Sequence, residues 1–251
     1  MIRGNVTDRP WGKTLGTLAR RGVTGQLTVR NHNAKFEIAF HHGLVVAAAS
    51  SGSAESATAL AFRQGLITAG QVSSIPFGAA NDWELLARLL PPQDIVRLQR
   101  QAIAACVARS FVFADGELTL DAEITLRVVP QLAMHVGGMI FHGARMFLGE
   151  QRLRAGVHAL GSRFTTAQRA DVRCFGLSAR DQVIADIVLQ GTSASLLDAI
   201  GDAEERRTAR AAVYAFVSCG AMQGEGPAIP ASAPVRKAAR LAPGRTQREL
   251  R

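Results

Sequence analysis

Three short strand-like segments follow one another near the start of the chain, and they constrain the fold more than any other feature. Residues 26–30 and 35–40 alternate polar and apolar side chains, and Asn-His-Asn at 31–33 supplies turn residues between them. His-His-Gly at 41–43 predicts a second turn, and residues 44–49 form a continuous apolar run. Strands joined by turns this short pair antiparallel. We therefore expect a small antiparallel meander.

Helical patterns surround this predicted sheet. Apolar spacing and capping signals predict helices that begin at Trp11, Ser53, Thr68, Asn81 and Pro92. The dipeptide Asp-Gly at 115–116 lies between Phe-Val-Phe at 111–113 and Leu-Thr-Leu at 118–120, which predicts a hairpin with a type I′ turn.

The second half of the chain has the composition of a helical region. We expect helices at 132–148 and at about 150–160, followed by a loop over 161–173. Three more helices are predicted, with Ser178, Ser193 and Asp202 as their N-caps and with Gly220 after the last one. The sequence past Gly220 leaves no room for a two-stranded wing before the Pro-rich tail.

These patterns predict an α+β protein in three parts. Residues 1–128 form a small antiparallel sheet with helices, residues 129–226 form a helical, winged-helix-like domain, and residues 227–251 form a disordered basic tail. The formal net charge is +9, and the tail contributes about half of it, with six basic residues and one acidic residue. The overall charge is therefore weak support for an anionic partner.

The composition, together with the lack of a recognisable targeting segment, predicts a cytoplasmic, globular protein. Hydrophobic residues make up 47% of the chain and charged residues 20%, which is ordinary for a folded domain. The three cysteines are an odd number without close pairs, unlike a secreted disulfide framework. The first twenty residues lack the apolar core of a signal peptide, and the apolar stretch 132–148 is too short for a membrane span.

Residues 11–121 resemble the PATAN domain, an accessory module of bacterial response regulators and other signalling proteins. The segments that carry this resemblance are 22–30, 36–47 and 113–118. It implies protein–protein interaction in a signalling complex, without catalysis. Residues 163–223 are similar to the winged-helix-like segment that follows PATAN regions in some bacterial proteins.

A shorter resemblance concerns a possible ligand. Residues 59–68 are similar to a helical repeat of secretion-ATPase N-terminal domains, some of which bind cyclic dinucleotides. A helix, a glycine stop and a new N-cap explain the same residues structurally.

The histidines suggest two candidate metal sites, each with a structural alternative. His32 lies in a turn at one end of a predicted strand, and His41 and His42 lie at the other end. This separation favours the interpretation that they are exposed turn residues and do not share a metal ion. A second row follows one face of the predicted helix 132–148 and could bind copper or haem, but it also suits helix packing. Its members are His135, Met139, His142 and Met146.

No enzyme signature is present in the chain. It lacks the serine-hydrolase, phosphate-binding and dinucleotide-binding glycine motifs, and each cysteine suits a small buried hydrophobe. We therefore expect no catalytic residue, metal or cofactor.

The expected function is that of a non-catalytic bacterial signalling adaptor that binds protein. The alternative is a DNA-binding transcriptional regulator that uses the last three helices and the basic tail. Acidic residues in the first turn of the third helix, at Asp202, Glu204 and Glu205, oppose this alternative because they would repel phosphates. The candidate interaction residues are Arg30, Lys35, His41 and His42 in the first domain, with Arg206 and Arg210 in the second.

Overall fold

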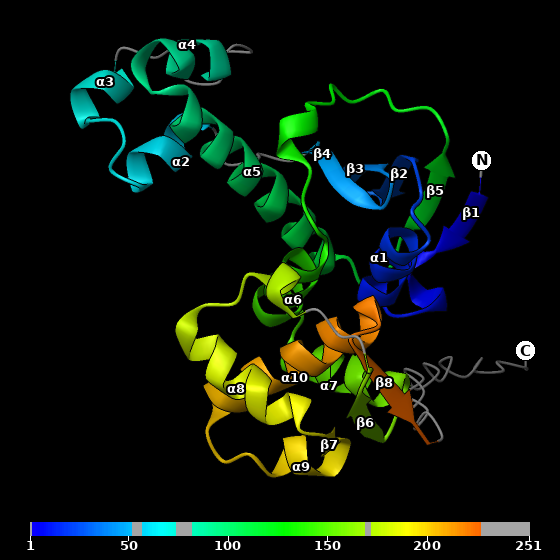
Figure 1. The fold of residues 1–251 in the computed structure, drawn as a ribbon. Coiled ribbons are helices and arrows are strands. Elements are labelled where there is room, and N and C mark those ends of the chain that lie inside the picture. The colour runs from blue at the N-terminus through cyan, green and yellow to red at the C-terminus, as the bar shows by residue number, and fades with distance from the viewer. Residues whose placement is uncertain (1, 52–56, 74–81, 169–171, 227–251) are drawn as a thin grey trace, which may run out of the picture.

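The computed structural model combines helices with two antiparallel sheets (Figure 1), which confirms the mixed α+β class. It describes residues 2–51, 57–73, 82–168 and 172–226. The tail predicted for 227–251 and the caps predicted at Ser53 and Asn81 lie outside these residues. Within them, no helix has the length and apolar character needed to cross a membrane.

The larger sheet has five antiparallel strands in the order β1-β5-β2-β3-β4. The predicted meander is confirmed, because β2, β3 and β4 pair in sequence order, with a register shift between β3 and β4 at Ala39 and Phe40. Strand β1 was not predicted. The strands are β1 (Ile2–Asn5), β2 (Gly25–Arg30), β3 (Lys35–His41), β4 (Leu44–Ser50) and β5 (Glu117–Asp121).

The hairpin predicted across Asp115-Gly116 is wrong. Residues Ser110–Val112 form a 3-10 helix, and β5 pairs with β1 and β2 instead. Phe111 and Phe113 are both buried, and the space beside Phe111 is closed by Gly143, where an added Cβ would lie 2.3 Å from the ring. The aromatic pair therefore anchors the end of a helix in the core, and tertiary packing overrides the local turn signal.

The helices of the first half fall into two groups. Helices α1 (Trp11–Arg20) and α5 (Pro92–Arg109) belong to the main core, whereas α2 (Ala57–Arg63), α3 (Ala69–Ser73) and α4 (Asp82–Leu89) surround the first half of α5 (Figure 1). This second group has a small apolar cluster of its own. Thr68 and Gln71 form the predicted capping box of α3, with each side chain bonded to the other's backbone N–H.

Five α-helices and a second sheet are the main elements in the rest of the described chain. The predicted N-caps are confirmed, because Ser178, Ser193 and Asp202 each accept a hydrogen bond from a backbone N–H three residues on. Gly220 ends the last helix at a φ of +79°. The helices are α6 (Gly137–Phe147), α7 (Glu150–Leu160), α8 (Ala179–Leu189), α9 (Ala194–Ala199) and α10 (Ala203–Cys219).

Two predictions in this half need correction. The helix predicted over 132–148 begins only at Gly137, because Pro130–Leu132 form a 3-10 helix and the backbone of Met134 exchanges two hydrogen bonds with Val45 of β4. Strands also form within the loop predicted over 161–173 and past Gly220, where the sequence was expected to leave no room for a wing. The strands β6 (Arg163–Thr166), β7 (Thr192–Ser193) and β8 (Met222–Glu225) make a sheet in the order β7-β6-β8.

The main hydrophobic core runs without a break across residue 128, the expected domain boundary. It includes Val29 and Ile38 of the large sheet together with Phe216 of α10. Helix α1 approaches α10 so closely that a Cβ on Gly16 would lie 2.2 Å from the carbonyl oxygen of Ser218. The backbone N–H of Gly12 also donates a 2.9 Å hydrogen bond to the hydroxyl of Tyr214. The two halves are therefore packed through a shared interior.

Candidate interaction groove

Two of the predicted interaction residues lie on the polar face of the large sheet. Arg30 and Lys35 occupy paired positions on β2 and β3. The guanidinium of Arg30 lies 3.0 Å from the carboxylate of Glu117, and the ammonium of Lys35 lies 2.9 Å from that of Glu37. Exposed pairs of this kind contribute little to stability and leave the face open to water.

The predicted residues His41 and His42 lie at the turn between β3 and β4. Both are exposed, and their ring centroids are 4.3 Å apart. His42 has a left-handed φ of 49°, and its backbone N–H donates to the hydroxyl of Thr24. Across the residues that the structure describes, no three His, Cys, Asp or Glu side chains gather in a way that could hold a metal ion.

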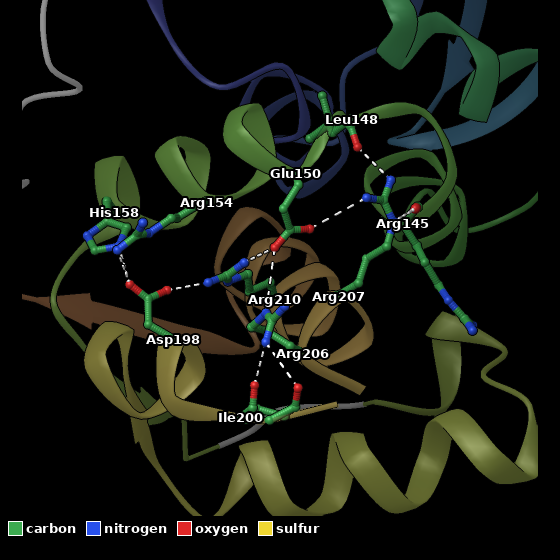
Figure 2. A network of polar contacts seen from close by, with 11 residues as sticks. Arg145, Leu148, Glu150, Arg154, His158, Asp198, Ile200, Arg206, Arg207 and Arg210 are labelled. Carbon is green, nitrogen blue, oxygen red and sulfur yellow. Dashed lines mark hydrogen bonds and ion pairs between the residues drawn. The ribbon is translucent and has the colours of Figure 1, made fainter. Parts of the chain in front are cut away.

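The other two predicted residues, Arg206 and Arg210, point into the protein (Figure 2). Arg210 is 5% exposed and binds the carboxylates of Glu150 and Asp198. Arg206 donates a 2.6 Å hydrogen bond to the carbonyl oxygen of Ile200. These contacts join α10 to α7 and α9, so both arginines hold neighbouring helices together.

Asp198 is the second centre of this network. It accepts a 2.5 Å contact from Arg154, and the Nε2 atom of His158 lies 3.6 Å away (Figure 2). Burial by itself would raise the pKa of Asp198, but the hydrogen bonds and charges of Arg210 and Arg154 outweigh burial and lower it. The network therefore keeps the carboxylate ionised as a structural partner.

The buried side chains of Tyr214 and Cys219 are poorly suited to ionise. Burial raises the pKa of Tyr214 and of Cys219 to about 12 each. A phenol or thiol in that state is protonated near neutral pH and is a poor nucleophile.

Part of the histidine and methionine row lines an apolar cavity of about 630 Å³ between α5, α6 and the segment around Phe175. His135, Met139 and His142 line this cavity, but Met146 is 65% exposed and does not. His135 precedes the helix that was expected to carry it. Burial lowers the pKa of His142, so its ring is neutral near pH 7.

A larger groove of about 700 Å³ lies between the edge strand β4 and the helices that follow it. One wall is the edge of β4 from Val46 to Ser50, and the segment around Arg127 forms another. The remaining lining side chains come mainly from α2, α4 and α5, and most are apolar. They include Leu60, Trp83, Ala87, Ile95, Ala102, Ile103 and Cys106.

The groove presents a thiol and charges at its walls. Burial raises the pKa of the Cys106 thiol to about 11, against the smaller opposing effects of Arg109 and of a hydrogen bond with Ser50. The Cys106 thiol is therefore protonated near neutral pH. Among the described residues that line the groove, the charged side chains are Arg109, Arg127 and Glu84.

None of the residues that line this groove was among the predicted interaction residues. The apolar run at 44–49 predicts a strand, but it carries no information about the open edge of β4, which consists of backbone groups. In comparisons with known proteins, the chain matches no family model, no curated protein and no solved structure. The resemblance to the PATAN domain therefore stays a prediction.

Proposed function

We propose that the chain is a non-catalytic signalling adaptor of the bacterial cytoplasm, and that it binds a protein partner in the groove beside β4. The observation that carries this proposal is the groove itself, an apolar hollow of about 700 Å³ at the border between the sheet and the small helical group. Its volume lies within the range of typical binding pockets, and its walls combine apolar side chains with a few polar groups.

Two further observations support binding over catalysis. The thiol in the groove is held protonated by burial, since its pKa is about 11. Of the arginines that the sequence suggested as interaction residues on α10, Arg210 is buried and paired with two carboxylates, and Arg206 bonds to the carbonyl oxygen of Ile200.

The test compares partner capture by matched variants of the full chain. Ala87 is exposed on α4 and lines the groove, so Ala87→Arg places a charged side chain across it. Ala159→Arg is the control, because Ala159 is exposed near the end of α7, on a different helix. We expect a defined protein to be captured by the wild-type chain and by A159R but not by A87R. Equal capture by all three contradicts the proposal.

The alternative proposal is DNA binding by the last three helices. The three-stranded sheet beside α8, α9 and α10 favours it in outline, because a winged-helix fold combines such elements. However, α10 has no side free for a DNA groove over Thr208–Phe216, since every residue there is buried. Sequence-specific binding to duplex DNA that persists after removal of residues 227–251 would favour this alternative, whereas binding that is lost on removal would reflect tail charge alone.

A further inference from the structure

The backbone of β4 has an open outer edge. The N–H of Ser51 donates a 2.9 Å hydrogen bond to the carbonyl oxygen of Lys35, which fixes the alternation of the ladder between β3 and β4. In an antiparallel pair, every second residue directs its N–H and C=O toward the partner strand. The backbone N–H and C=O groups of Ala47 and Ala49 therefore point toward β3, whereas those of Ala48 and Ser50 point away from the sheet.

Within the described part of the chain, this outer edge is paired at Val45 alone. Val45 exchanges two 2.9 Å hydrogen bonds with Met134, and the pairing stops there. Among the residues that the structure describes, no backbone group outside β3 bonds to the N–H or C=O of Ala48 or Ser50. Both residues are partly exposed and line the groove. An edge of this kind is a template for one more strand.

The walls of the groove define the side chains that such a strand would need. Trp83 and Ile95 on one side, together with Val129 near the other, offer apolar contacts to residues that alternate along an extended chain. Arg127 is exposed at the groove, and arginine is the commoner charged residue among the described lining side chains, so an acidic side chain is favoured over a basic one.

We propose that the groove binds an extended segment of the partner protein as a sixth strand beside β4, with alternate apolar side chains and one acidic side chain near Arg109 and Arg127. This inference rests on the proposed function and names the form of its partner. Main-chain hydrogen bonds to Ala48 and Ser50 supply affinity, and the apolar and arginine walls supply specificity. The chain's own segment 227–251, with six basic residues and one acidic, has the wrong charge for this site.

The experiment uses random 12-residue peptides displayed on phage, selected against the full chain. Selected peptides are synthesised and their dissociation constants measured with the wild-type chain, A87R and A159R. Each peptide is then N-methylated at one residue at a time, which removes one N–H without changing the protein. We expect methylation at every second residue to weaken binding by about 10-fold or more, and methylation at the residues between to have little effect.

Two variants of the protein test the same peptide contacts by changing the groove and leaving the peptide unchanged. Ala48→Pro removes an outward N–H but leaves the ladder to β3 intact, so binding is expected to weaken by about 10-fold or more. Arg127→Glu is expected to raise the dissociation constant of acidic peptides by about 5-fold or more. Because A48P could perturb the edge strand, the methylation pattern on the wild-type chain decides the question if this variant melts early.

The possible results separate the two proposals. Peptides that bind the wild-type chain and A159R, fail with A87R, and show the alternating methylation pattern support both. Peptides that fail with A87R but show no alternation, or that prefer basic residues, overturn the added strand and leave the groove as a binding site. If no peptide distinguishes the wild-type chain from A87R, both proposals are contradicted.

Discussion

The arginine network of α10 and the groove beside β4 differ in where their polar groups find partners. In the network, Arg210 is almost fully buried and its guanidinium binds two carboxylates of the same chain. In the groove, the outward backbone groups of Ala48 and Ser50 have no backbone partner among the described residues. The charge cluster thus holds helices of the fold together, whereas the alanine-rich strand has outward backbone groups that the described chain does not pair.

The largest effect is expected where the network is broken. Arg210→Met removes the buried cation that Glu150 and Asp198 share and leaves these carboxylates with only their outer cationic partners, so we expect the free energy of unfolding to fall by about 3 kcal/mol. Urea denaturation measures this loss. Arg154→Met is the control, because Arg154 is 57% exposed and its loss is expected to cost about 1 kcal/mol or less. Equal losses in the two variants would contradict a structural role specific to Arg210.

The groove thiol is expected to react slowly. A pKa of about 11 lowers the thiolate fraction of Cys106 at pH 8 by about 100-fold relative to an unperturbed thiol with a pKa of 9.0. Because a more basic thiolate is also a better nucleophile, we expect alkylation by iodoacetamide to slow by about 10-fold or more. Mass spectrometry of the folded chain, with the same residue in urea as reference, measures the rate. Similar rates in both states would show that burial does not protect this thiol.

Acid is expected to weaken the network in a defined range. Because the pKa of Asp198 is lower in the folded chain than the unfolded value of 3.8, its contribution to stability is complete above pH 3.8 and is lost as the pH falls through the folded pKa. Asp198→Asn should therefore flatten the decline of the urea midpoint between pH 5 and pH 2. A decline as steep as that of the wild-type chain would show that this carboxylate is not the group that titrates.

The smallest effect is expected on the polar face of the sheet. Arg30 and Glu117 are both about two-thirds exposed, so Arg30→Ala should change the free energy of unfolding by about 0.5 kcal/mol or less. Urea denaturation in low and high salt is the measurement. A change near that of Arg210→Met would remove the distinction between surface pairs and the network.

Local sequence signals predicted elements whose partners are close in the chain. The turns at 31–33 and 41–43 place β2, β3 and β4 in register. The side chains of Ser178 and Asp202 cap helices by accepting hydrogen bonds from the backbone N–H three residues further on. These features depend on nearby residues alone, so periodicity and capping rules were sufficient.

The errors arose where distant segments decide the outcome. The hairpin at 111–120 fails because Phe111 packs against Gly143 and because β5 finds β1 and β2 as partners instead. Strand β6 pairs with β8 almost sixty residues later, which no local pattern in Arg163–Thr166 announces. Fold-level pairing of this kind cannot be derived from alternation over four residues.

The candidate site was missed for a related reason. Charged residues such as Arg206 and Arg210 draw attention in a sequence, but burial and ion pairing are properties of the folded chain. An open strand edge has no side-chain signature at all, because it consists of backbone N–H and C=O groups. It is defined by the folded chain: Met134 pairs with Val45, and no other described residue pairs with the outer edge of β4.

Amide hydrogen exchange of the full chain, with and without a selected 12-residue peptide, tests most directly where the protein binds. The outward amide of Ala48 should exchange freely in the unbound chain and become protected by the peptide, while amides of α10 around Arg210 stay unchanged. Protection over α9 and α10 without any change at Ala48 would contradict the account, because binding would then lie at the arginine network rather than in the groove.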